Sequence, residues 1–117
     1  MITAVFERNE SVKELTLKVS GHASFDEIGK DIVCASASIL TYTLAKVSEA
    51  MFEKGYLEKY PVLRLNGGDA LIECRCKTYF SFADAMQAFD MTKVGFTLLA
   101  ENYPQNVNVE AYSLLHK

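Results

Sequence analysis

The chain has 117 residues, half of them hydrophobic, with three cysteines, two prolines and no tryptophan. This length and apolar content suit one domain over residues 1–117 with a core of its own. The formal net charge is −3, whereas a general nucleic-acid-binding protein normally presents a basic face, so we expect no direct nucleic-acid binding. The apolar runs fall far short of the roughly 18 residues of a membrane span, so we expect no membrane association.

The cysteines and the N-terminal segment indicate a reducing compartment. Residues 1–8 place no basic segment before an apolar one, so we expect no signal peptide. An odd number of cysteines without a secretory signal is typical of free thiols in the cytosol. The expected localisation is therefore cytoplasmic.

Two strands joined by a hairpin are expected at the start of the chain. Apolar and polar residues alternate over residues 2–7 and 14–20, which is the period of a half-buried strand. The connection over residues 8–13 is short and polar, as in a hairpin. Residues 21–30 hold two glycines, two acids and a lysine, which predicts a loop.

A helix is expected over residues 32–53, because apolar residues recur there at every third or fourth position. Asp31 is well placed as the N-cap, since its carboxylate can accept a hydrogen bond from an unpaired N–H of the first turn. Gly55 is placed to end the helix. The expected core stripe consists of Val33, Ala37, Leu40, Leu44, Val47 and Met51.

A second pair of strands is expected over residues 62–65 and 70–76. They flank Asn66-Gly67-Gly68-Asp69, a strong hairpin-turn signal that lacks the lysine and the following helix of a phosphate-binding loop. Cys74 and Cys76 fall on the same face of the second strand. We interpret them as core residues, because a Cys-x-Cys metal site would need two more ligands at suitable spacing.

A second helix is expected over roughly residues 82–102, with Ser81 and Asp84 as a capping pair. Alternation over residues 107–111 predicts a short final strand, and His116 is expected to be solvated. The order β-β-α-β-β-α, with the final β, predicts an α+β fold. We expect a two-layer sandwich in which both helices pack on one face of an antiparallel or mixed sheet.

The segment from Gly21 to Cys34 carries the most definite chemistry. If Asp31 is the N-cap, Cys34 is the third helical residue, where unpaired N–H groups and the positive end of the helix dipole favour a thiolate. His22 directly follows the second strand, which could hold its imidazole over the helix N-terminus as a base. Gly21 allows close backbone approach or positive φ. The structural alternative is an inert helical cysteine beside an unrelated loop histidine.

Further residues lie around this pair. Asp31, Cys34 and Ser38 share one edge of the helix at i, i+3 and i+7. The N–H of Cys34 itself is a candidate oxyanion donor, because a helix N-terminus directs donors at developing negative charge. A third residue that orients the histidine stays open among Asp26, Glu27 and Asp31. Acyl transfer by such a pair needs no metal and no organic cofactor.

The chain resembles the ribosomal-processing cysteine protease family, Prp, in two segments: Gly21-His22-Ala23 and Asp31-Ile32-Val33-Cys34-Ala35-Ser36-Ala37-Ser38. The overall length and the order of the elements also match. The resemblance implies a cysteine endopeptidase that removes the N-terminal extension of the precursor of large-subunit ribosomal protein twenty-seven, cleaving after an aromatic residue. It further implies that Cys34 is the nucleophile and His22 the general base and then acid. Asp31 and Ser38 match further motif positions.

The resemblance also implies partners. A ribosomal protein precursor is the expected substrate partner, and a homodimer is expected because family members form homodimers. The rival function from another class is a non-enzymatic ribosome-assembly factor in which Cys34 is a redox-sensitive or structural thiol. The two hypotheses differ in whether a cleaved product appears and whether His22 matters.

Overall fold

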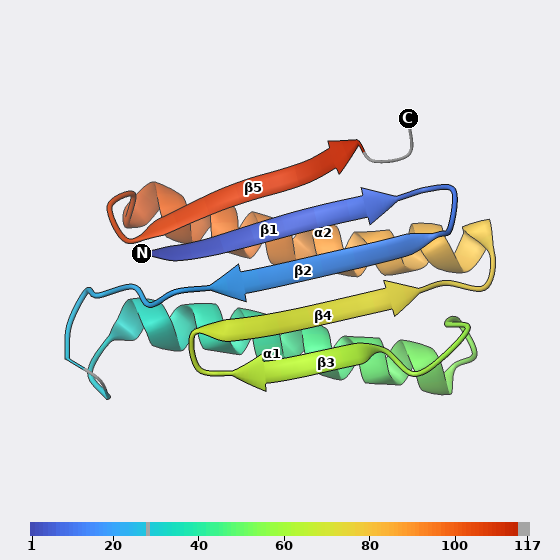
Figure 1. Cartoon of the computed structure of the whole chain (residues 1–117), viewed down its shortest axis with the longest axis horizontal. Helices are drawn as coiled ribbons and strands as arrows, with labels where there is room; N and C mark the ends of the chain where they lie inside the picture. The colour runs from blue at the N-terminus through green and yellow to red at the C-terminus, as the bar shows by residue number, and fades with distance from the viewer. Residues whose placement is uncertain (28, 115–117) are drawn as a thin grey trace.

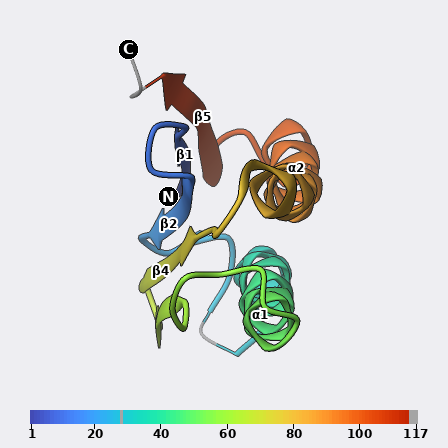
Figure 2. The same cartoon turned by 90° about the vertical axis from the view of Figure 1, so that its right-hand side faces the viewer.

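The computed structural model describes residues 1–27 and 29–114, so Ile28 and the tail with His116 lie outside the described residues. The strands form one sheet in the order β3-β4-β2-β1-β5, and both helices cover the same face of it (Figures 1 and 2). The elements are β1 (Ile2–Asn9), β2 (Glu14–Ser20), α1 (Ile32–Glu53), β3 (Val62–Asn66), β4 (Asp69–Arg75), α2 (Tyr79–Asn102) and β5 (Val107–Leu114).

The sheet is mixed, because β5 pairs parallel to β1 whereas the other neighbouring strands pair antiparallel. This arrangement confirms the predicted α+β sandwich and its element order. The final strand is longer than expected and extends to Leu114. No helix in the described ranges combines the length and the apolar character needed to cross a bilayer.

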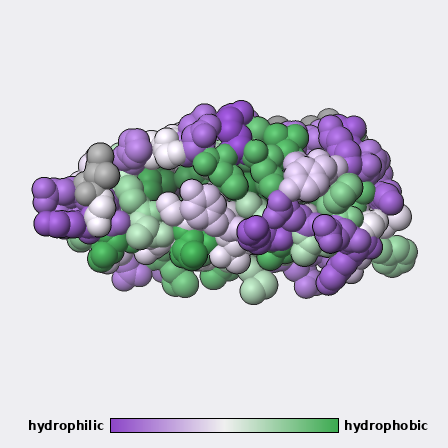
Figure 3. Space-filling model, turned by 90° about the horizontal axis from the view of Figure 1, so that it is seen from below, coloured by the Kyte–Doolittle hydropathy of each residue, from purple (hydrophilic) through white to green (hydrophobic). Residues whose placement is uncertain are grey.

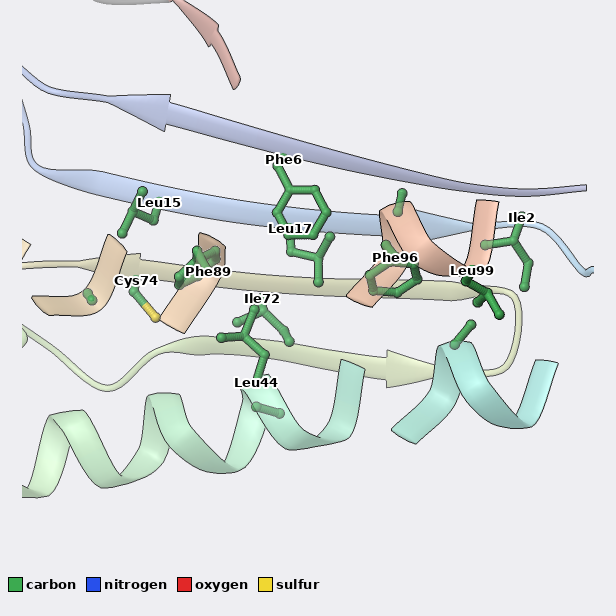
Figure 4. Packing of buried hydrophobic residues seen from close by; sticks show 14 of the residues in the cluster. Ile2, Phe6, Leu15, Leu17, Leu44, Ile72, Cys74, Phe89, Phe96 and Leu99 are labelled. Atoms are coloured by element: carbon green, nitrogen blue, oxygen red, sulfur yellow. The ribbon is translucent and has the colours of Figure 1, made fainter. Parts of the chain in front are cut away.

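The register of the sheet gathers the apolar sides of the strands under the helices. Phe6 lies opposite Leu17, and Leu17 lies opposite Ile72, across three neighbouring strands. All three side chains are fully buried and face the helical layer (Figure 4). Because side chains alternate along a strand, a slip of one residue would turn this whole set toward solvent.

Helix α1 has the predicted ends but a different buried face. Asp31 is its N-cap, and the C-cap residue is followed by Gly55. Within the expected stripe, however, Val47 is 37% exposed, while Thr41 and Ser48 are buried. Each buried hydroxyl donates to the carbonyl oxygen four residues earlier, at 2.8 Å. These bonds satisfy the hydroxyls within the helix, so they can be buried without an unpaired polar group.

Helix α2 begins three residues earlier than expected. Its N-cap is Thr78, whose side chain accepts the N–H of Ser81, and the Ser81 hydroxyl in turn accepts the N–H of Thr78. The predicted capping pair of Ser81 and Asp84 was therefore wrong: Ser81 is the inner member of a capping box. The extra turn was missed because its aromatic residues are exposed, whereas the apolar pattern of the buried face starts only at Phe82.

The two later cysteines lie in the core, as predicted. Cys74 and Cys76 are fully buried free thiols. Burial raises the pKa of Cys74 to about 11 and that of Cys76 to about 12. Both are therefore neutral at physiological pH and closed to reagents in the folded chain.

Two phenylalanines of α2 offer a matched test of this core. Phe89 is completely buried, whereas Phe80 is 87% exposed. Phe89→Ala should lower the free energy of unfolding by about 3–5 kcal/mol through lost burial and a residual cavity. Phe80→Ala should change it by less than about 0.5 kcal/mol. Urea denaturation followed by circular dichroism measures both, and equal effects would contradict the assigned helix face.

Candidate functional site

A groove of about 630 Å³ opens where the chain leaves β2 and enters α1. The loop after β2, the first turns of α1 and the β3–β4 turn form its walls. It brings together five of the residues singled out in the sequence: Gly21, His22, Asp31, Cys34 and Ser38. Seen from the α1 and β3 side, the end of the molecule formed by this loop is hydrophilic, and hydrophobic side chains are exposed farther along the same face (Figure 3).

The Asp31 carboxylate joins the loop to the helix. Its Oδ1 accepts the N–H groups of Val33 and Cys34, both at 3.0 Å. Its Oδ2 accepts the N–H groups of Phe25 at 2.9 Å and Asp26 at 3.2 Å. Partial burial raises the pKa of Asp31, but the four N–H donors outweigh it and hold the pKa below the ordinary value. The side chain is therefore an anion at neutral pH.

These four bonds limit what else Asp31 can do. A carboxylate has about four acceptor positions, and the four N–H donors occupy them. Asp31 is thus a structural clamp rather than a free partner for His22. Of the other two residues considered for orienting His22, Asp26 lines the groove, and Glu27 pairs with Lys30 at 3.5 Å.

Cys34 is the third residue of α1, as predicted, and its side chain is partly buried in the groove. Its Sγ accepts a hydrogen bond from the N–H of Ala23 at 3.4 Å. The predicted oxyanion role of the Cys34 N–H is not available in this arrangement, because that N–H donates to Asp31. The reason is local: an N-cap carboxylate captures the N–H groups of the second and third helical residues.

Gly21 sets the route by which the chain leaves the sheet. It has a φ of +88°, and a Cβ on it would lie 2.2 Å from the carbonyl oxygen of Met1. Its N–H donates to the carbonyl oxygen of Gly68 at 3.0 Å. A side chain at this position would therefore collide with backbone at the start of β1 and would also strain its own backbone.

The imidazole of His22 lies against the β3–β4 turn. A Cβ on Gly68, whose φ is +77°, would lie only 2.7 Å from His22 Nε2. Gly68 therefore contributes to placing His22, although the sequence indicates only a hairpin turn. The contact depends on the tertiary fold, because no local sequence pattern links this turn to a loop more than forty residues earlier.

His22 and Cys34 share the groove but are not bonded to each other in the part of the chain that the structure describes. Proton transfer between them therefore requires a closer approach, as is common before substrate binds. Ser38 is exposed one turn after Cys34. Among the described residues, no cluster of three or more His, Cys, Asp or Glu side chains is arranged to hold a metal ion.

Beside its polar end, the groove has an apolar wall. The wall gathers side chains from four strands and from α1: Ile2, Val19, Ala37, Tyr42, Leu65 and Ala70. Apolar walls with a few convergent polar groups are typical of binding sites. The arrangement suits a ligand that places an apolar group on the wall and a polar group near the sulfur of Cys34.

Comparisons with known proteins give the family of the chain and relatives of its fold. A family model described as cysteine protease Prp matches residues 1–108. Two S. aureus structures of an essential ribosomal processing protease Prp share the fold, each covering 95% of this chain and 99% of that chain. The one with a covalently linked product peptide has a TM-score of 0.70 at 24% identity, and the one with a substrate peptide has 0.64 at 23%.

A third similar structure is SMU.848 from Streptococcus mutans, with a TM-score of 0.66 and 27% identity over 97% of this chain and 96% of that chain. No curated protein matches the chain. The two helices over a mixed sheet are therefore an arrangement shared with solved structures over nearly the whole chain.

Neighbouring glycines of the β3–β4 turn provide a test of how His22 is held. Gly68→Ala should shift the NMR signals of the His22 imidazole, because the new methyl group would occupy its position. Gly67→Ala is the matched control, since a Cβ there meets no atom within 4 Å. The chain has two histidines, so the imidazole signals can be assigned with a His22→Gln variant. Unchanged His22 signals in the Gly68 variant would refute the contact.

Proposed function

The chain belongs to the Prp family of cysteine proteases, and we propose that Cys34 is its nucleophile and His22 its general base and acid. The observation that carries this proposal is the groove in which a partly buried thiol and an imidazole lie beside an apolar wall. Cysteine proteases work by this combination of nucleophile and base. The substrate we propose is the N-terminal extension of the precursor of large-subunit ribosomal protein twenty-seven.

The proposed reaction is acyl transfer in two steps. His22 takes the proton of the Cys34 thiol, and the sulfur attacks the scissile carbonyl carbon. The C–N bond then breaks, His22 gives the proton to the leaving amine, and the extension stays on Cys34 as a thioester. Water attacks the thioester with His22 again as base, which releases the extension as a carboxylic acid. The scheme uses neither a metal nor an organic cofactor.

Three further residues have proposed supporting roles. Gly21 directs the loop away from the sheet, and Asp31 ties that loop to the start of α1. Ser38 is exposed in the groove one turn beyond the sulfur, where its hydroxyl can contact the imidazole or the peptide. Peptide complexes of the S. aureus Prp, one of them covalent, support a peptide substrate for this groove.

The compartment and assembly are also part of the proposal. Cys34, Cys74 and Cys76 are free thiols, which suits a reducing cytoplasm, where ribosomal precursors are made. A homodimer is supported by apolar side chains on the outward faces of both helices. Those of Ile39, Met91, Val94 and Leu98 are each more than half exposed.

The outward helical faces make the homodimer testable. Leu40 of α1 packs against Gly95 of α2, so the exposed neighbours Ile39 and Val94 lie on adjacent helices. Light scattering during gel filtration should give twice the mass of one chain. The double variant Ile39→Glu and Val94→Glu should give the mass of one chain, because paired charges cannot be buried in an apolar interface. A wild-type monomer at micromolar concentration, or a dimeric double variant, would contradict this surface.

Cleavage of the full-length precursor tests the proposed activity. Cys34→Ala should abolish cleavage and His22→Ala should reduce kcat at least about a thousandfold, because each removes one member of the reacting pair. Ser36→Ala is a control from the same helix, since Ser36 binds a helix carbonyl and lies outside the groove; it should cleave normally. Mass spectrometry of the product N-terminus measures the outcome, and a Cys34→Ala variant that still cleaves would refute the nucleophile.

A further inference from the structure

The connection between α2 and β5 is linked to the sulfur of Cys34 by two hydrogen bonds that share one residue, Ala23. The side-chain amide of Asn106 donates to the carbonyl oxygen of Ala23 at 2.9 Å. Ala23 is 1% exposed, and its own N–H donates to Cys34 Sγ at 3.4 Å. Asn106 does not line the groove, and its direct side-chain link toward Cys34 is this bond to Ala23.

Asn106 is itself firmly held. Its N–H donates to the carbonyl oxygen of Tyr103 at 2.9 Å, and its carbonyl oxygen accepts the N–H of Ile2 at 2.8 Å. The same turn makes a second contact with the loop, because the ring of Tyr103 packs edge-on against Phe25 at 5.2 Å between centroids. The amide of Asn106 is therefore presented to Ala23 from a frame that includes the first strand.

The residue after Ala23 shows why such a hold is needed. Ser24 has a φ of +56°, which is uncommon for a residue other than glycine and costs energy. Such a backbone persists only where its surroundings fix it. Here the fixing bonds lie on both sides: Asn106 holds the carbonyl of Ala23, and Asp31 holds the N–H of Phe25. Without the Asn106 bond, Ser24 can relax and move Ala23 away from the sulfur.

The N–H of Ala23 is important because the helix offers the sulfur little. Asp31 takes the N–H groups of Val33 and Cys34, and its own negative charge opposes the positive helix end. Among the described residues, the one group that donates a hydrogen bond to Cys34 Sγ is the N–H of Ala23. This bond therefore sets where the sulfur lies relative to the loop.

We propose that Asn106 is a positioning residue that keeps the N–H of Ala23 on Cys34 Sγ and so holds the sulfur in place in the groove. The proposal rests on the proposed function only in treating Cys34 as the reacting group. It assigns an active-site role to a residue 72 positions after Cys34 in the chain.

The test is the pH dependence of iodoacetamide labelling at Cys34, mapped by mass spectrometry. In Asn106→Ala the labelling profile should depart from that of the wild type, and the rate at pH 7 should fall about three- to tenfold, because the sulfur loses its hydrogen bond to the loop. Asn102→Ala is the matched control, because the Asn102 amide also donates to a carbonyl, that of Leu98 at 2.8 Å, on the exposed end of α2. It should leave the profile unchanged.

Two outcomes would overturn the proposal: an Asn106→Ala profile that superimposes on wild type, or an equal shift in Asn102→Ala. Asn106→Leu repeats the test with a side chain of similar size that lacks the amide donor. The buried thiols of Cys74 and Cys76 serve as an internal control for folding. An unfolded chain is labelled at all three cysteines, so only molecules labelled at Cys34 alone are counted.

Labelling needs no substrate, so the two proposals fail separately. If Cys34→Ala still cleaves the precursor, the proposed function fails, whereas the labelling shift still decides the role of Asn106. If cleavage requires Cys34 but the profile is unchanged, only the role of Asn106 fails. In the cleavage assay Asn106→Ala should lower kcat and leave KM unchanged, because the residue lies outside the groove. A raised KM with normal kcat would instead indicate a general disturbance of the groove and would overturn the proposal.

Discussion

The bidentate clamp of Asp31 is the interaction on which the geometry of the groove depends. One oxygen closes the first turn of α1, and the other holds the loop that returns from β2. Without these bonds, the loop between His22 and Cys34 would lose its attachment to the first turn of the helix. The clamp also has a chemical consequence, since it occupies the helix N–H groups that would otherwise stabilise an anion at Cys34. The hydrogen bond to the sulfur then comes from a donor elsewhere in the fold, the N–H of Ala23.

That donor and its supports come together because of the sheet order. β1 lies between β2 and β5, so its first residues adjoin both the end of β2 and the turn before β5. Met1 limits the space beside Gly21, and Ile2 binds the backbone of Asn106. The antiparallel pairing of β2 with β4 brings the β3–β4 turn beside the same loop, where Gly68 meets His22. The groove is thus built and supported by three connections and the start of β1, which meet at one end of one sheet.

Local rules predicted much of this molecule. The alternation of β1 and β2, the Asn66–Asp69 turn and the N-cap of α1 each depend on a few adjacent residues, and each was found where expected. The face of α1 was less predictable, because Thr41 and Ser48 are buried by hydroxyl bonds that a count of apolar residues ignores. The start of α2 was missed because its capping box lies before the apolar pattern begins.

The candidate site also has features that the sequence predicts and features that it does not. The proximity of residues 21–22 to the first turn of α1 follows from a short loop, so sequence alone could propose it. The contact of Gly68 with His22 and the bond from Asn106 to Ala23 join residues 46 and 83 positions apart, and no local pattern encodes them. The expected oxyanion role of the Cys34 N–H failed for a related reason. The cap and the donor were each predicted, but their competition for one N–H was not.

The central claim is that Cys34 forms a covalent bond with the peptide that is cut. The most direct measurement is an acid quench of the wild-type chain during turnover of the precursor, followed by digestion and mass spectrometry. The account predicts that the peptide containing Cys34 carries the extension as a thioester. Its mass should increase by the mass of the free extension acid less one water. Product formation without this adduct, or an adduct on any other residue, would contradict the account.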